Sequence, residues 1–277
     1  MSSDKPIFTC QLFPTLEQKL VELLRSLSKE DWTRPTVARK WTVKDVAAHL
    51  LDGNLKRLSM QRDGFFGLPA PTTDGYEEFI AFINRNNAEW VQAASRISPQ
   101  VLVDLIEITS KEVAKMFSAI DPHAPAIWAV TWAGEQQSAN WFDIAREYTE
   151  RWHHQQQIRE AVRRPGIETR ELYHPVLDTF MRGLPHVFRG VDARTSTCVE
   201  LEITGGAGGL WFLEKAESGW RLTASAHRPA ATLRMPQNLA WRVFTKAVAP
   251  KDGERLTEVE GDRRLALHIL SLVAVLA

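Results

Sequence analysis

The sequence predicts a helical N-terminal domain followed by a small α+β domain. Apolar residues recur at helical spacing through about the first 165 residues. After Asp192 the apolar residues alternate, and glycine-rich turns separate them, which is typical of strands. At 277 residues the chain is longer than most single hydrophobic cores. We therefore expect a helical domain over 1–168, a connecting helix over 169–192 and an α+β domain over 193–277.

Four helical segments precede the middle of the chain. Thr42 is a good helix N-cap, and Asp45 stands where the acid of a capping box reaches back. Glycines and prolines around Phe65-Phe66 predict a loop over 64–74. The expected helices cover about 15–27, 42–62, 76–97 and 99–120.

A long central helix is expected from Asn140 to the Pro165-Gly166 stop. Before it, Pro122 and Pro125 end the previous helix, and a tryptophan-rich loop fills 126–139. The inward-facing residues of the central helix are predicted to be Ile144, Tyr148, Gln155, Ile158 and Val162.

The second half begins with a helix over 170–189 and continues with strands. Cys198 to Thr204 alternates like a half-buried strand, and Gly205 to Gly209 then turns the chain into 210–213, which predicts a hairpin. No helix follows these glycines, so they predict turn geometry and no phosphate cradle. Further strands are expected at 221–224 and 231–234, and helices at 236–247 and 264–277.

The composition excludes several classes of protein. Apolar residues make up 44% and charged residues 25%, as in ordinary globular proteins. Lys plus Arg and Asp plus Glu are 34 each, which argues against nucleic acid and against an anionic membrane surface as partners. The N-terminus lacks the features of a signal peptide, and the apolar tail over 269–277 is too short to span a bilayer. Two cysteines, Cys10 and Cys198, are expected to be buried or idle thiols in a reducing cytoplasm.

Three residues form a candidate metal site. Glu150 precedes His154 by four residues, which places both side chains on one face of the central helix. His49 lies among apolar residues of an expected bundle helix and needs a polar partner. Two imidazoles and a carboxylate suit a divalent metal with an open coordination position, and bundle interiors host such sites. Taken alone, the pair on one helix is weak evidence, because many such pairs only stabilise a solvated helix.

Other candidate ligands rank lower. His153 adjoins His154 but points about 100° away around the helix, and Thr149 stands four residues before it. Glu147 has Arg151 as its i+4 partner, which indicates a surface ion pair. The remaining histidines are expected to be structural or exposed. They are His123, His174, His186, His227 and His268. No Ser-His-Asp, Cys-His or His-Glu-x-x-His motif occurs, and no catalytic residue is assigned.

Two stretches carry a resemblance to a known family. They are Trp41-Thr42-Val43-Lys44-Asp45-Val46-Ala47-Ala48-His49-Leu50 and Thr149-Glu150-Arg151-Trp152-His153-His154-Gln155-Gln156-Gln157-Ile158-Arg159. Because of these stretches, the first 165 or so residues resemble the DinB-like superfamily of metal-dependent four-helix bundles. Within that superfamily they resemble the branch of the mycothiol-dependent maleylpyruvate isomerase N-terminal domain. The C-terminal part resembles the small sterol-carrier-like domain of that branch.

The resemblance implies a function for the site. Carried over by position, His49, Glu150 and His154 would hold a divalent metal, usually zinc. A low-molecular-weight thiol such as mycothiol would attack a small electrophilic substrate in a transfer or isomerisation reaction. Relatives use a C-terminal arginine toward the substrate, for which Arg242 is the better candidate and Arg234 the other. The branch often has an aspartate where this chain has Gln157.

Two other functions are also consistent with the sequence. A metal-dependent hydrolase would bind water at the open position, with its pKa lowered toward about 7. A non-catalytic protein would bind a small molecule, with tryptophans such as Trp128 and Trp132 lining the cleft, although such aromatic residues are more often core. We expect a cytoplasmic monomer or homodimer that binds a small molecule and neither nucleic acid nor membrane.

Overall fold

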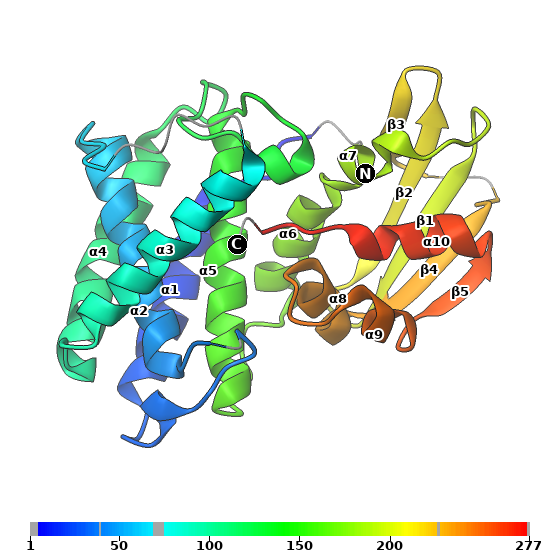
Figure 1. The fold of residues 1–277 in the computed structure, drawn as a ribbon. Coiled ribbons are helices and arrows are strands. Elements are labelled where there is room, and N and C mark those ends of the chain that lie inside the picture. Colours follow the sequence, from blue (N-terminus) through cyan, green and yellow to red (C-terminus); the bar gives the residue numbers. More distant parts are fainter. Residues whose placement is uncertain (1–4, 39, 69–74, 226–227, 276–277) are drawn as a thin grey trace. The chain divides into compact units, whose positions relative to one another are not determined.

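The computed structural model describes residues 5–38, 40–68, 75–225 and 228–275. These residues group into two compact units, which Figure 1 shows. The helical unit contains Cys10–Asp121 and Glu150–Ile167, and the mixed unit contains 5–9, Pro122–Thr149 and Glu168–Val275. A helical N-terminal region followed by a sheet domain confirms the predicted fold class. The expected boundaries at 168 and 192 stay predictions.

Among the described residues of the first 161, five helices are long. They are α1 (Phe13–Arg25), α2 (Val43–Lys56), α3 (Tyr76–Ala94), α4 (Pro99–Ala119) and α5 (Asn140–Ala161). A short helical turn, η1 (Cys10–Leu12), precedes α1, and others lie between the helices at η2 (Asp31–Thr33), η3 (Arg57–Arg62) and η4 (Thr131–Ala133). The helices expected from the sequence are therefore present.

Helix α2 begins where the sequence predicts. The Thr42 hydroxyl accepts a hydrogen bond from the Asp45 backbone N–H at 3.3 Å, and the Asp45 carboxylate accepts one from the Thr42 N–H at 2.9 Å. This reciprocal capping box satisfies two N–H groups that a helix start leaves without partners. The last expected turn, η3, is a π-helix.

Apolar faces and polar contacts hold the helical unit together. Helix α4 packs against α1 and α2, and α2 also packs against α3. The Ser110 hydroxyl donates to Glu17 at 2.9 Å, and Arg25 lies 3.2 Å from Asp104, so α1 and α4 run antiparallel. A shared core of buried side chains lies between the helices. It includes Leu20, Leu24, Val43, Val46, Leu50, Leu102, Ile106 and Ile158.

The mixed unit contains a five-stranded sheet in the order β3-β2-β1-β4-β5. Its strands are β1 (Cys198–Thr204), β2 (Gly209–Ala216), β3 (Gly219–Thr223), β4 (Ala231–Pro236) and β5 (Glu258–Gly261). Strands β1 and β4 are parallel, and the other neighbouring pairs are antiparallel. The β1–β2 pair confirms the hairpin that the Gly205–Gly209 turn predicts.

The mixed unit also contains short helices, several of which pack against the strands. They are α6 (Arg170–Met181), α7 (Leu184–Val187), α8 (Gln237–Phe244), α9 (Pro250–Glu254) and α10 (Arg263–His268), with turns η5 (Phe188–Gly190) and η6 (Ile269–Ser271). Alternate residues of β1, Val199, Leu201 and Ile203, are buried, whereas Glu200 and Glu202 between them are half-exposed. The alternation of apolar and polar residues in the sequence therefore matches the alternation of buried and exposed side chains along the strand.

Some expected boundaries differ from the structure. Strand β5 and helix α9 were not expected from the sequence. The last α-helix ends at His268 because the chain tightens into η6 before Leu272. The predicted loop is present over 64–68, while its remainder, 69–74, lies outside the described residues, as do His227 and the last two residues. Among the helices of the described ranges, none is long and apolar enough to cross a membrane.

Candidate metal centre

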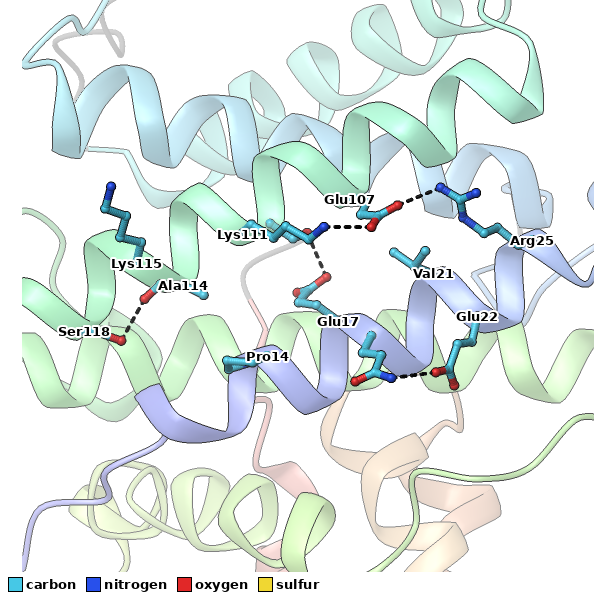
Figure 2. Close-up of a pocket in the computed structure, with 12 residues that line it drawn as sticks. Pro14, Glu17, Val21, Glu22, Arg25, Glu107, Lys111, Ala114, Lys115 and Ser118 are labelled. Atoms are coloured by element: carbon cyan, nitrogen blue, oxygen red, sulfur yellow. Dashed lines mark hydrogen bonds and ion pairs between the residues drawn. The ribbon is translucent and has the colours of Figure 1, made fainter.

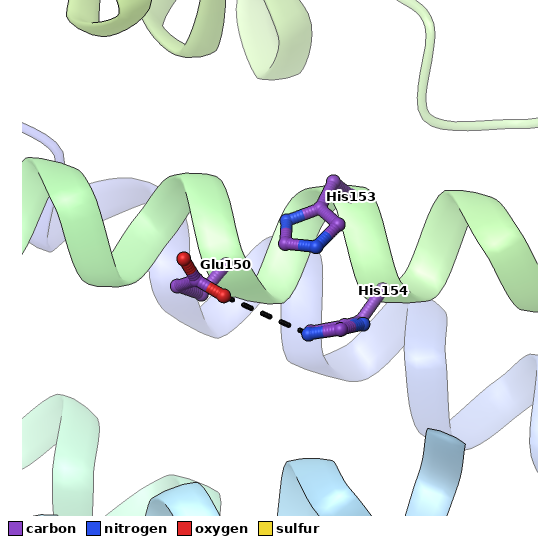
Figure 3. A group of neighbouring side chains, drawn as sticks. All are labelled: Glu150, His153 and His154. Carbon is purple, nitrogen blue, oxygen red and sulfur yellow. Dashed lines mark ion pairs between the residues drawn. The ribbon is translucent and has the colours of Figure 1, made fainter. Parts of the chain in front are cut away.

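Helix α5 brings three potential metal ligands together. Glu150, His153 and His154 each offer a donor atom, and these atoms lie within 4.8 Å of one another. Figure 3 shows the three side chains on neighbouring turns of the helix, with Glu150 and His154 joined by a dashed line. His154 Nε2 lies 3.6 Å from Glu150 Oε2. The predicted pairing of Glu150 with His154 is therefore present.

His49 reaches the same place from α2. Its ring centroid lies 4.7 Å from that of His154, and Trp41 packs against it at 4.9 Å. The Nδ1 atom of His49 is shielded from solvent and has no hydrogen-bond partner among the described residues. Leaving such a nitrogen unsatisfied costs about 1–3 kcal/mol, so this atom is suited to a ligand that the protein itself does not supply.

The surroundings of His49 favour its neutral imidazole, the form that can bind a metal. Burial lowers the pKa of His49 well below 6.5, the charge of His154 lowers it further, and Glu150 opposes this shift. His49 is therefore neutral at pH 7, and a neutral imidazole is the form that binds a metal.

An ion pair lies further along α2 from His49. Lys56 Nζ is 2.5 Å from Asp52 Oδ2, and Asp52 is buried. Burial raises the pKa of Asp52, and its hydrogen bond with Lys56 opposes that shift. The charge of Lys56 also contributes to lowering the pKa of His49.

The donor set fits a divalent metal. Imidazole nitrogens and one carboxylate are ligands that zinc accepts, and a tetrahedral ion with three protein ligands keeps one position open. The unsatisfied Nδ1 of His49 supports this fit. The same donors could polarise a thiol, a water molecule or a carbonyl oxygen.

The structure also places His153 in the group, which the sequence analysis ranked lower. The rings of His153 and His154 lie 4.0 Å apart despite the 100° between consecutive helical positions. His153 follows Glu150 by three residues, and i,i+3 positions share a helix face as i,i+4 positions do. That spacing was the signal that could have found it.

The interpretation of Glu147 and Arg151 as a surface ion pair is wrong. Arg151 is 4% exposed and Glu147 8% exposed. The Arg151 guanidinium lies 2.7 Å from Glu17 on α1 and over the Phe13 ring. The i,i+4 spacing does not reveal this contact, because the partner lies 134 residues away in the sequence.

The two candidate substrate arginines differ in their surroundings. Arg234 on β4 lies 2.6 Å from Glu202 and 3.0 Å from Glu258, so two carboxylates hold its charge. Arg242 on α8 is half-buried, with its guanidinium over the ring of Trp241. A role for Arg242 toward a substrate stays a prediction, and the surroundings of Arg234 make it the weaker candidate.

A separate groove of 840 Å³ runs between α1 and α4 (Figure 2). Charged side chains line it, and several of them pair with one another. Arg25 and Lys111 both contact Glu107, and Glu17 on its floor accepts a hydrogen bond from Ser110. Charges that neutralise one another in this way do not select a ligand of either sign.

Comparisons with known proteins agree with the resemblance. The family model of the mycothiol maleylpyruvate isomerase N-terminal domain matches residues 13–159. This match confirms the expected family, while the sterol-carrier likeness of the C-terminal part stays a prediction. A search of curated proteins found no match.

Two solved structures are similar over most of the chain. A crystal structure of a histidine-to-alanine mutant of the mycothiol-dependent maleylpyruvate isomerase has a TM-score of 0.52 at 10% identity, and the alignment covers 91% of each chain. A second crystal structure of the mycothiol-dependent maleylpyruvate isomerase has a TM-score of 0.47 at 11% identity, covering 86% of this chain and 88% of that one. At such low identity the first of these shows a common fold and no more.

Proposed function

The chain belongs to the mycothiol maleylpyruvate isomerase N-terminal domain family, and from this membership we propose that it is a metal-dependent enzyme acting with a low-molecular-weight thiol. The reaction would be the isomerisation of a small electrophilic substrate or the transfer of the thiol to it. The observation that carries the proposal is the Glu150–His154 pair on α5, 3.6 Å apart, with the unsatisfied His49 beside it.

Three residues would hold the metal, with zinc as the first candidate. Glu150 and His154 would provide a carboxylate and an imidazole from one helix, and His49 would provide a second imidazole from α2. His49 is preferred to His153 as the third ligand because its shielded nitrogen lacks a hydrogen-bond partner among the described residues. A bound zinc ion would supply Lewis acidity, which lowers the pKa of a thiol so that it is a nucleophile at neutral pH.

The surrounding residues would bind and orient the reactants. Trp41 packs on the His49 ring and limits its rotation. Arg242 belongs to the mixed unit and stays the candidate that the family resemblance suggests for a substrate carboxylate.

Thiol-dependent turnover tests the proposal. Zinc-loaded protein would be assayed with mycothiol and maleylpyruvate, the thiol and substrate in the names of the similar structures. We expect that isomerisation requires the thiol. The turnover rate should fall at least about 100-fold in His154→Ala, because that variant loses a metal ligand. Turnover of an electrophile or ester without any thiol would instead support the hydrolase.

A pair of variants separates the candidate third ligands. His49→Ala should lower zinc affinity and turnover together, whereas His153→Ala should leave zinc affinity within about threefold of wild type. The opposite pattern would place His153 in the metal's coordination shell and remove His49 from it.

A further inference from the structure

His154 makes a hydrogen bond that determines how its ring can be used. Nδ1 of His154 lies 2.9 Å from Oε1 of Gln157, and both side chains are buried. An amide oxygen can only accept, so with Oε1 facing the ring the contact assigns the hydrogen to Nδ1. In the neutral ring, the lone pair is then on Nε2, the atom that faces Glu150 at 3.6 Å.

We propose that Gln157 is a positioning residue that holds His154 with Nε2 directed at the metal. This inference rests on the proposed function. The spacing supports it, because Gln157 follows His154 by three residues and Glu150 precedes it by four, so the three side chains lie along one face of α5. A residue that accepts from the far nitrogen of a metal-binding histidine fixes both the tautomer and the ring orientation.

The amide also sets the charge around the metal. An amide is neutral, so Glu150 would be the sole anion among the three proposed ligands and this supporting residue. A divalent ion held by His49, Glu150 and His154 keeps one positive charge in excess. A carboxylate at position 157 would cancel that charge and make the imidazole a stronger donor. Gln157 therefore leaves the ion more electrophilic, at the expense of binding it less tightly.

The first test needs no metal. Long-range ¹H–¹⁵N spectra of the histidine rings in the metal-free full chain report which nitrogen is protonated. We expect the hydrogen of His154 on Nδ1 in the wild type and its movement to Nε2 in Gln157→Leu, which has no acceptor. Gln156→Leu is the matched control, because Gln156 is a neighbouring buried amide whose Oε1 has no hydrogen-bond partner among the described residues.

The second test measures zinc affinity by competition with a chelator. Gln157→Leu should bind zinc about 10- to 100-fold more weakly than the wild type, the usual effect of losing such a partner. Gln157→Glu keeps an acceptor and adds a charge, so it should bind zinc more tightly than the wild type. Gln156→Leu should bind like the wild type. The zinc affinity of Gln157→Glu tests the role of Gln157 even if Gln157→Leu does not fold.

The results separate this inference from the proposed function. Wild-type protein that binds no zinc would overturn both. Wild-type protein that binds zinc, with Gln157→Leu binding equally well, would overturn the role of Gln157 and leave the metal site standing. Weaker binding by Gln157→Glu, or a tautomer unchanged in Gln157→Leu, would likewise contradict the positioning role.

Discussion

Arg151 and Glu17 form a buried ion pair between α5 and α1. Their exposed fractions are 4% and 7%, and the two charged groups lie 2.7 Å apart. Arg151→Met should destabilise the protein by about 3–5 kcal/mol, because it leaves the Glu17 carboxylate buried without its counter-charge. Urea unfolding followed by circular dichroism measures the change.

Controls for this prediction lie at the same pair and on the surface nearby. Adding Glu17→Gln to Arg151→Met should recover part of the lost stability, since it removes the isolated charge. Lys111→Met removes an ion pair with Glu107 whose lysine is 72% exposed, and should cost at most about 1 kcal/mol. Equal effects of Arg151→Met and Lys111→Met would show that burial does not set the strength of the Arg151 pair.

Cys198 is predicted to be an unreactive thiol. Burial, with help from the charges of Glu214 and Glu200, raises its pKa from 9.0 to about 11. At pH 8 only about one thousandth of it would be thiolate. Ellman's reagent should therefore modify Cys198 far more slowly in the native protein than in urea, with Cys198→Ser identifying the signal. Rapid native labelling of this residue at pH 8 would contradict the shift.

The same shift predicts a dependence of stability on pH. The folded state favours the neutral thiol, so this contribution to stability is present below pH 9 and is lost as the pH rises through about 11. The difference in stability between wild type and Cys198→Ser should shrink over that range.

At the scale of elements, two glycines of the β1–β2 turn have very different surroundings. A Cβ added to Gly208 would lie 1.8 Å from the carbonyl oxygen of Ile203, whereas one added to Gly206 meets nothing within 4 Å. Gly208→Ala should destabilise the hairpin by on the order of 2–3 kcal/mol, and Gly206→Ala by less than about 0.5 kcal/mol. Thermal unfolding of the two variants checks this difference, and equal melting temperatures would contradict it.

Elements with strong local signals could be predicted from the sequence, and elements without them could not. The Thr42–Asp45 capping box is formed, and the predicted inward residues of α5 are buried. Strand β5, with the sequence Glu-Val-Glu-Gly, is mostly exposed and too short to show alternation. Among the described residues it pairs with β4, at the edge of the sheet, so its strand conformation comes from that tertiary pairing.

The site shows the same division between local and long-range information. The i,i+4 spacing of Glu150 and His154 and the apolar surroundings of His49 were enough to expect their proximity, and their side chains do lie together. Neither the proximity of His153 to His154 nor the contact between Arg151 and Glu17 was expected. The i,i+3 spacing from Glu150 was a local signal for His153 that was given too little weight. The contact between Arg151 and Glu17 depends on which helices pack together, and no fixed sequence spacing encodes it.

For the molecule as a whole, the proposed metal would link α2 to α5. A ligand that binds only the folded state adds about 2.7 kcal/mol of stability when its concentration is 100 times its dissociation constant. Zinc should therefore raise the melting temperature of the wild type and leave that of His154→Ala unchanged. A rise of equal size in both proteins would mean that zinc binds elsewhere.

Metal content of the untagged protein, measured by inductively coupled plasma mass spectrometry, tests the central claim most directly. Wild type, His49→Ala, Glu150→Gln and His154→Ala would be compared after identical purification. We expect about one zinc or similar divalent ion per wild-type chain and strongly reduced content in each variant. Wild-type protein that holds no metal, and cannot be loaded with zinc, nickel or manganese, would contradict it.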